Sequence, residues 1–423
     1  MLRYINVLFI LVCAGLSACS INPVTGERQF SLVSASEEVT LGEQNYVPYQ
    51  QSQGGQYIVD PNLSAYVSKV GRKLAAVSDR KDLPYEFVVL NNDVPNAWAL
   101  PGGKIAINRG LLLLLDDEAQ LAAVMGHEIV HAAARHGATQ QTQQKLLGLG
   151  TGIVGLVSNS QLANYGAQLG AGAWQARYGR SQELESDEYG MLYMERAGYE
   201  PQAAVELQEL FVKLSEGHNS DFLTNLMASH PPSQERVDKN LARAKTMNKG
   251  LRNRAAFQRA IAQIKKDKGA YDANAKALEA YSKKDYSSAL SYANQAIKLQ
   301  DEEALFYVTR GQILTAQKQM SAAESAFSVA TKKYPEYFMG FLGLGLTQKS
   351  EGKLSTARTS LTKSLKLLPT QSAVYHLGEV ELASGNQQQA IQYFQAAQSQ
   401  GGDLGQAAES QLAKLGVSSQ AQP

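Results

Sequence analysis

The chain contains 423 residues, which is enough for about two or three domains. Its apolar fraction of 44% is typical of a globular protein that can bury a core. The 40 basic and 39 acidic residues nearly cancel, so the formal net charge is only +1. This balance argues against the basic surface that a nucleic-acid-binding protein needs.

Residues 1–18 are typical of a secretion signal. Arg3 supplies a positive charge near the start, and the apolar stretch from Ile5 to Val12 is too short to span a membrane. The sequence Leu16-Ser17-Ala18-Cys19 resembles the lipobox of bacterial lipoproteins, which implies cleavage before Cys19 and acylation of Cys19. The alternatives are an ordinary signal peptide and an uncleaved anchor.

Several acyl chains on Cys19 would anchor the mature chain stably to a membrane. Because Cys13 lies in the removed segment, the mature chain could form no disulfide. In such lipoproteins an Asp after the acylated Cys implies retention in the inner membrane, so Ser20 favours the periplasmic leaflet of the outer membrane. Residues 19–56 are rich in polar residues and glycine, and we expect them to form a tether from this anchor.

Residues 57–268 are expected to form one domain of helices with a small β-sheet, ending in a basic linker. Apolar residues recur at helical spacing from Asp60 to Ala76, and the run from Tyr85 to Leu90 is rich in β-forming residues. Residues 96–107 place Pro-Gly-Gly between two apolar runs, which fits a hairpin. Its edge could pair with an extended peptide, or the hairpin could be purely structural.

The chain reads H-E-x-x-H from His127 to His131, late in a helix expected over residues 118–135 with Asp116 as its N-cap. Residues four apart share a helical face, so both histidines can bind one ion. Glu128 would then lie where it can accept a proton from metal-bound water. Zinc suits two imidazoles and a carboxylate. The alternative is a pair of buried histidines that only form hydrogen bonds.

A third ligand must come from elsewhere in the chain. The metzincin pattern requires a His where this chain has Gly137, and the adjacent His136 is expected to point to another helical face. Residues 180–198 are expected to form a helix on which Glu183 and Asp187 share a face. One could bind the ion while the other orients an imidazole, or both could belong to a solvated acidic face.

The segment from 145 to 174 is rich in Gly, Ala and Leu and carries almost no charge after Lys145. Its continuous apolar part, Leu146 to Val157, is too short to span a bilayer. A mobile lid, a membrane-facing flap and buried helical packing all fit this composition.

Residues 271–415 repeat with a period of about 34 residues. Small residues recur in two columns: Ala277, Gly311, Gly345 and Gly378, then Ala289, Ala323, Ala357 and Ala390. Because Pro335 and Pro369 close the second and third units, we identify the tetratricopeptide pattern. We expect an all-α superhelix of about four repeats that binds a protein or peptide in its concave groove. Residues 416–423 are expected to form a tail.

Several motifs together resemble those of the HtpX-like gluzincin metallopeptidases, most closely the BepA-type periplasmic proteases with C-terminal repeats. The resemblance covers roughly Cys19 to Arg243 and implies a gluzincin domain before the repeats. The matching segments are Asn22-Pro23-Val24-Thr25-Gly26, Asn96 to Gly103, His127 to His131, Ser181 to Asp187 and Ser229-His230-Pro231-Pro232. Relatives more often show Ser-Arg where this chain has Arg180-Ser181.

This resemblance implies a role for each candidate residue. The ligands of one zinc ion would be His127, His131 and Glu183. Glu128 would be the catalytic base, and Asp187 would orient a ligand from behind. His230 matches the family's His-Pro element near the metal, where it would stabilise the oxyanion or occupy the open coordination position in a resting state.

Two functions of different classes remain open. The first is a periplasmic zinc endopeptidase that degrades misfolded or stalled envelope proteins, with the repeats binding clients or an outer-membrane assembly machine. The second is a non-proteolytic assembly factor or chaperone for outer-membrane proteins with a latent metal site. A catalytic base at Glu128 favours the first, because a structural zinc site does not need one.

Overall fold

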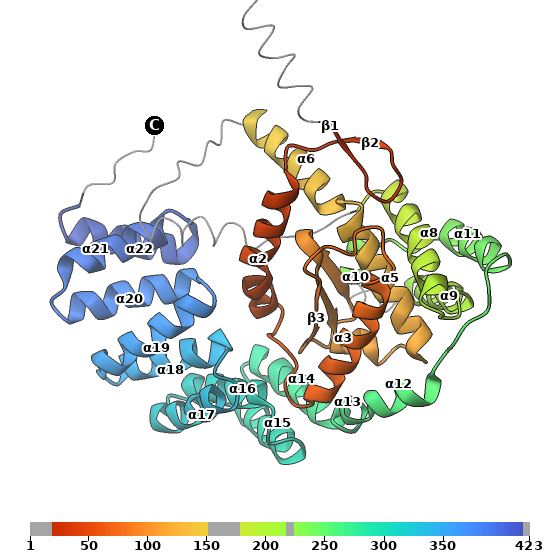
Figure 1. The fold of residues 1–423 in the computed structure, drawn as a ribbon. Helices are drawn as coiled ribbons and strands as arrows, with labels where there is room; N and C mark the ends of the chain where they lie inside the picture. The colour runs from red at the N-terminus through yellow and green to blue at the C-terminus, as the bar shows by residue number, and fades with distance from the viewer. Residues whose placement is uncertain (1–18, 151–177, 217–223, 418–423) are drawn as a thin grey trace, which may run out of the picture. The chain divides into compact units, whose positions relative to one another are not determined.

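The structure, a computed structural model, describes residues 19–150, 178–216 and 224–417 (Figure 1). It is mainly helical, as the sequence predicts, and no helix in these ranges is both long and apolar enough to cross a membrane. The expected secretion signal, residues 151–174 of the Gly/Ala/Leu-rich segment and the last six residues lie outside the described part.

The described residues divide into two compact units. The first takes in residues 19–46, 60–150 and most of 178–263, and the second takes in residues 47–59 and 264–417. Besides the elements introduced below, the first unit contains α3 (Pro61–Ala75), α4 (Arg109–Leu112), α6 (His136–Gly150), α9 (Gln202–Glu216), α10 (Thr224–Ser229), α11 (Gln234–Ala244) and α12 (Arg254–Ala260). Helix α13 (Ala262–Lys266) follows, so the expected basic linker contains short helices.

The first unit contains a three-stranded sheet in the order β3-β5-β4, formed by β3 (Glu86–Leu90), β4 (Ala97–Leu100) and β5 (Lys104–Asn108). Strand β3 runs parallel to β5, whereas β4 runs antiparallel to it. The predicted hairpin is therefore confirmed. Its connection, η1 (Pro101–Gly103), needs glycine because Gly102 and Gly103 have φ angles of 75° and 81°.

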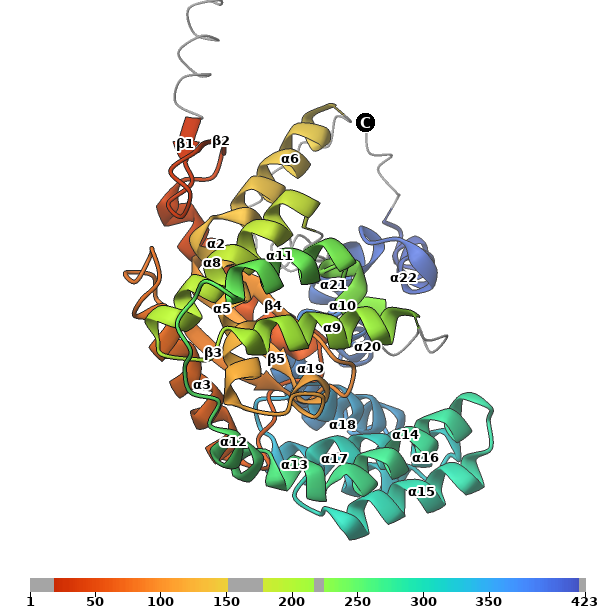
Figure 2. The ribbon, with the colours of Figure 1, turned by 90° about the vertical axis from the view of Figure 1, so that its right-hand side faces the viewer.

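Helix α5 (Glu118–Ala133) is buried on nearly every side because α3, α8, α9 and β4 all contact it (Figure 2). Its N-cap is Asp117, whose carboxylate accepts a 3.0 Å hydrogen bond from the Gln120 N–H, so the prediction of Asp116 was off by one residue. At its contact with α8 (Arg180–Arg196), a Cβ on Gly126 would lie 3.0 Å from the carbonyl oxygen of Gly190. The small residues let the two helix backbones approach closely.

The segment that we expected to be a tether is folded. Strand β1 (Cys19–Ile21) pairs antiparallel with β2 (Arg28–Phe30), and helix α2 (Ala35–Ser52) follows. The polar composition was misleading because one of these polar side chains is fully buried: Glu38 pairs with Arg80 at 3.1 Å and with Arg135 at 2.9 Å. Both partners lie far away in the sequence.

The predicted repeats are confirmed in the second unit, where consecutive helices pair as α14/α15, α16/α17, α18/α19 and α20/α21. These helices and the final one are α14 (Lys268–Ser282), α15 (Tyr286–Leu299), α16 (Ala304–Ala316), α17 (Met320–Lys333), α18 (Phe338–Ser350), α19 (Leu354–Leu367), α20 (Gln371–Ala383), α21 (Gln387–Gln398) and α22 (Gly402–Lys414). A Cβ on Gly378 would lie 2.7 Å from the Phe394 ring, which explains the small residues of the first column.

The second unit also takes in residues 47–59, which the sequence did not predict. The Gln51 amide donates a 2.7 Å hydrogen bond to the Glu336 carbonyl and accepts one of 2.9 Å from the Phe338 N–H. The Gln56 N–H donates to the Tyr334 hydroxyl at 2.8 Å. This short segment is thus held to the connection between α17 and α18.

Candidate metal centre

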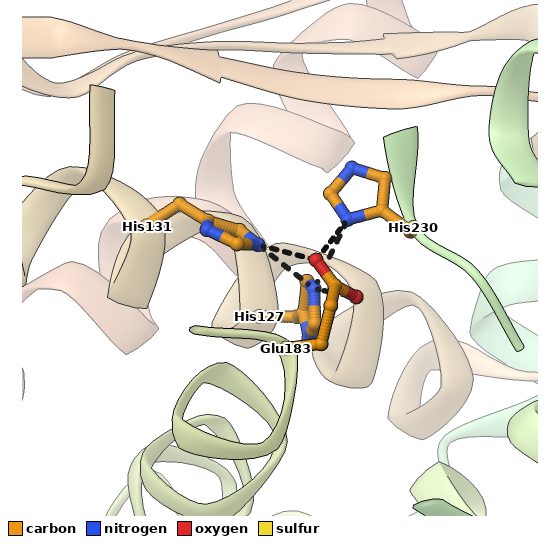
Figure 3. A group of neighbouring side chains, drawn as sticks. All are labelled: His127, His131, Glu183 and His230. Atoms are coloured by element: carbon orange, nitrogen blue, oxygen red, sulfur yellow. Dashed lines mark hydrogen bonds and ion pairs between the residues drawn. The ribbon is translucent and has the colours of Figure 1, made fainter. Parts of the chain in front are cut away.

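Four side chains from α5, α8 and the chain after α10 converge in the first unit (Figure 3). His127 and His131 lie one turn apart on α5, and their Nε2 atoms are 3.0 Å apart. These nitrogens lie 3.5 and 3.4 Å from the carboxylate of Glu183, in the first turn of α8. His230 Nδ1 lies 3.1 Å from the same carboxylate. One ligand atom from each residue falls within 4.8 Å of the others, a grouping that could hold a metal ion.

Glu128 lies beside this group and is 2% exposed. Its Oε1 is 3.5 Å from His230 Nε2, whereas its Oε2 has no hydrogen-bond partner among the described residues. Burial raises the pKa of this carboxyl. Buried carboxylate oxygens normally have partners. An unsatisfied one next to three imidazoles and a second carboxylate therefore fits a site that takes a metal ion together with water.

The model of peptidase family M48 matches residues 61–244, and the tetratricopeptide repeat model matches residues 274–338 and 342–408. Residues 61–244 form an M48 peptidase domain. The four converging side chains all lie within this domain. The predicted resemblance and the predicted order of the two domains are therefore confirmed.

Two relatives show the extent of the similarity. The mitochondrial metalloendopeptidase OMA1 of Schizosaccharomyces pombe is 30% identical over 225 residues, which cover 51% of this chain and 64% of the relative. The beta-barrel assembly-enhancing protease of Escherichia coli is 31% identical over 234 residues, which cover 53% of this chain and 47% of the relative. The match thus spans about half to two thirds of the length of these relatives.

In the M48 domain, Asp187 lies behind His127, where its Oδ1 is 3.0 Å from Nδ1. A carboxylate only accepts, so Nδ1 carries a hydrogen, and in the neutral ring Nε2 is then free to bind a metal. Arg236 on α11 donates to both oxygens of Asp187 at 2.7 Å, and its Nη1 lies 2.7 Å from Glu183. Burial would raise the pKa of Asp187, but Arg236 and His127 together outweigh burial, so the pKa is lowered.

The sequence interpretation missed Arg236. Ser233 caps α11 by accepting a hydrogen bond from the Arg236 N–H, so Arg236 lies in the first turn of this helix. The only local signal was an Arg six residues after His230. Its carboxylate partner Asp187 lies 49 residues earlier in the chain, and no local pattern links the two.

His136 lies beside His131, and our expectation for the direction of its side chain was wrong. Its Nδ1 is 2.8 Å from His131 Nδ1. We expected His136 to point to another face of one continuous helix, but α5 ends at Ala133 and Arg135 takes a positive φ of 65°. The chain therefore turns, and His136 begins α6 close to His131. The group of four candidate ligands does not include it.

Tyr178 connects the candidate centre to the sheet. Its ring stacks on the His131 ring with 3.6 Å between centroids, and its hydroxyl donates a 3.4 Å hydrogen bond to the Ala99 carbonyl on β4. Strand β4 lies at one edge of the described sheet. One side chain thus bridges an edge strand and a candidate ligand.

A pocket of about 540 Å³, which includes space open to solvent, lies beside the centre. His127, Glu128 and His230 contribute to its wall. Most of the remaining wall is apolar and includes Val124, Met191, Met194, Leu207, Phe211 and Leu226. The M48 domain therefore places a mostly apolar pocket next to its candidate base.

Proposed function

We propose that this chain is a zinc metalloendopeptidase. The observation that carries the proposal is the convergence of His127, His131 and Glu183 with the buried, partly unsatisfied carboxylate of Glu128. Two imidazoles and one carboxylate form a known ligand set for catalytic zinc, and one ion per chain would fit among them. The match of residues 61–244 to the model of peptidase family M48 supports the same activity, as does similarity to a metalloendopeptidase and to a protease.

Each residue of the centre would have a defined task. A zinc ion in this site would lower the pKa of bound water and polarise the scissile carbonyl. Glu128 would accept the proton from that water and later deliver it to the leaving amine. Asp187 and Arg236 would hold His127 in the tautomer that keeps Nε2 free.

His230 would have one of two roles. Its imidazole could stabilise the oxyanion that forms when the carbonyl is attacked. Alternatively, it could occupy the coordination position that water needs, because its Nδ1 already lies 3.1 Å from Glu183. The second role would make the described arrangement a resting state.

The substrate would bind as an extended chain. Strand β4 lies at a sheet edge, but its residues are buried and its Ala99 carbonyl is bonded to Tyr178. A peptide would therefore add along β4 only after Tyr178 moves, and it would then pass close to the metal. The apolar pocket would then receive one of its side chains. Unfolded segments meet this requirement, whereas folded proteins do not expose their backbone in this way.

We further propose that the protein works in the periplasm, anchored through acylated Cys19 to the inner leaflet of the outer membrane. Its clients would be misfolded or stalled outer-membrane proteins. This choice is supported by the similarity to the E. coli relative, which is named a beta-barrel assembly-enhancing protease. The repeats would bind clients or an assembly machine, since tetratricopeptide arrays commonly bind proteins.

A second candidate function is that of a non-proteolytic assembly factor or chaperone with a latent metal site. The observation that favours it is His230, a fourth side chain within the ligand group. If this imidazole remained bound to the metal, no position would be left for water in a four-coordinate site.

One experiment separates the two functions. The wild type and Glu128→Gln are loaded with zinc, their zinc content is measured, and both are incubated with an unfolded outer-membrane protein. We expect equal zinc content, cleavage by the wild type and none by the variant. Cleavage by Glu128→Gln would refute the mechanism. Absence of cleavage by either form, with improved client assembly, would establish the chaperone function.

A further inference from the structure

The β1–β2 ribbon at the start of the described chain has two chemically different faces. Cys19 lies opposite Phe30, and Ile21 lies opposite Arg28. Residues directly opposite each other and residues two apart share a face of a strand pair, so these four residues occupy one face. Ser20 and Gln29 occupy the other face.

The exposed fractions of the side chains alternate along the chain in the same way. Ile21 is 63% exposed and Phe30 44%, and Leu32, two residues further on, is 40% exposed. Arg28 is also exposed, whereas Ser31 and Val33 are buried. We call Ile21, Arg28, Phe30 and Leu32 the outward face, and Cys19 lies opposite Phe30 in the strand register. The outward face gathers three large apolar side chains within a few residues of the expected acylation site.

The opposite side of the ribbon is held to the M48 domain. The Gln29 amide donates a 3.3 Å hydrogen bond to the carbonyl of Ala134, directly after α5. Arg135 donates to the Val33 carbonyl at 2.6 Å. The Leu32 N–H donates to the Thr142 hydroxyl on α6 at 2.9 Å. These bonds attach the ribbon, and the residues directly after it, to the chain that follows α5 and to α6.

We propose that the outward face lies on the surface of a lipid bilayer. This inference rests on the proposed acylation, because acyl chains on Cys19 would enter the membrane from this same face. Ile21, Phe30 and Leu32 would contact the acyl boundary, and Arg28 would lie near the lipid phosphates. Exposed aliphatic and aromatic side chains beside a cationic one are the composition that membrane interfaces favour.

The consequence is an M48 domain with a fixed orientation on the membrane. A polar tether would let the domain rotate freely around its anchor. Here the anchored residue belongs to a ribbon that is hydrogen-bonded to the chain that follows α5. The outward face would therefore set the direction in which the candidate centre faces.

The experiment tests whether the outward face contacts lipid, independently of whether Cys19 is acylated. The chain from Cys19 onward has a single thiol, so it can be coupled to a maleimide phospholipid in vesicles regardless of acylation in cells. Phe30→Trp reports on the face, and Leu251→Trp is the matched control, because Leu251 is also an exposed apolar residue of the first unit. Emission is compared between vesicles with and without brominated lipids, after subtracting the emission of the coupled parent.

We expect the emission of Phe30→Trp to shift to shorter wavelength and to be quenched by brominated lipids, while that of Leu251→Trp stays unchanged. Equal quenching of both, or of neither, would overturn the proposal. A shift that depends on protein concentration without lipid would overturn it too, by assigning the face to a second copy of the chain.

Acylation is measured in a separate experiment, as the mass of the Cys19 peptide from membrane-extracted protein. A mass without acyl chains would overturn both the anchor and the inference that rests on it. The vesicle result would still show whether the face itself binds lipid, so the two failures remain distinguishable.

Discussion

The side-chain amide of Asn22 donates a 2.7 Å hydrogen bond to Oε1 of Glu185, although 163 residues separate the two. The same oxygen lies 3.4 Å from Nε2 of His136, whose Nδ1 lies 2.8 Å from His131. The turn that follows β1 is therefore linked, through three side chains, to a candidate metal ligand.

This chain of contacts predicts a graded effect on zinc binding. We expect His136→Ala to lower zinc affinity by about 10–100-fold, the usual effect of removing a side chain that supports a metal ligand. Asn22→Ala should also lower zinc affinity, but by less, because Asn22 is two contacts further from His131 than His136 is. Affinity is measured by competition with a chromophoric chelator.

Asn45→Ala is the matched control, since the Asn45 amide donates to the Leu41 carbonyl of its own helix. It should leave zinc affinity unchanged. The link would be contradicted if Asn22→Ala and Asn45→Ala gave the same affinity.

A second prediction concerns Arg236, which holds two buried carboxylates. In zinc-free protein, Arg236→Ala should lower the free energy of unfolding by about 3–5 kcal/mol, because it leaves Asp187 and Glu183 without their cation. Arg236→Lys should cost less but should not restore the parent value, since Lys cannot contact both oxygens of Asp187 as Arg does. Urea denaturation measures both changes.

Arg243, on the same helix, provides the comparison. Its pair with Glu188 is partly exposed, so Arg243→Ala should cost only about 0–1 kcal/mol. Equal losses for Arg236→Ala and Arg243→Ala would show that the buried contacts do not stabilise the domain.

A third prediction concerns the helix crossings of the repeats. In Gly378→Ala the new Cβ would lie 2.7 Å from the Phe394 ring, so we expect the free energy of unfolding to fall by about 1–3 kcal/mol. In Gly269→Ala the nearest atom, on Leu299, is 4.0 Å away, and the better helix propensity of Ala should raise stability by up to about 1 kcal/mol. Thermal unfolding should separate the two variants, and a destabilised Gly269→Ala would contradict this account.

A fourth prediction concerns the pH dependence of the repeats. Burial would raise the pKa of Glu379, but contacts with His376 and Lys349 outweigh it and lower the pKa to about 2, from a usual value of 4.5. Because the folded pKa is the lower one, this carboxylate stabilises the fold above pH 4.5, and its contribution is lost as the pH falls toward 2.

Glu379→Gln should therefore be less stable than the parent at pH 7, and the difference should shrink between pH 4.5 and pH 2. Denaturation at several pH values checks this, with Glu409→Gln on α22 as the exposed control. A difference that does not change with pH would rule out the ion pair as its source.

The sequence by itself determined the features that depend on near neighbours. The spacing of His127 and His131 predicts a shared helical face because one helical turn separates them. The 34-residue period predicts the repeats because each unit packs on the next. The β4–β5 hairpin and the helix that carries Glu183 were predicted for the same reason, since turn glycines and apolar periodicity are local signals.

Only the tertiary structure decided which distant groups meet. Arg236 reaches Asp187, Asn22 reaches Glu185, and residues 47–59 join the repeats, each through contacts between segments far apart in the chain. The expected tether is folded for the same reason: the partners of Glu38 lie on other elements. Polar composition does not distinguish a solvated side chain from a buried one whose partner arrives only when the chain folds.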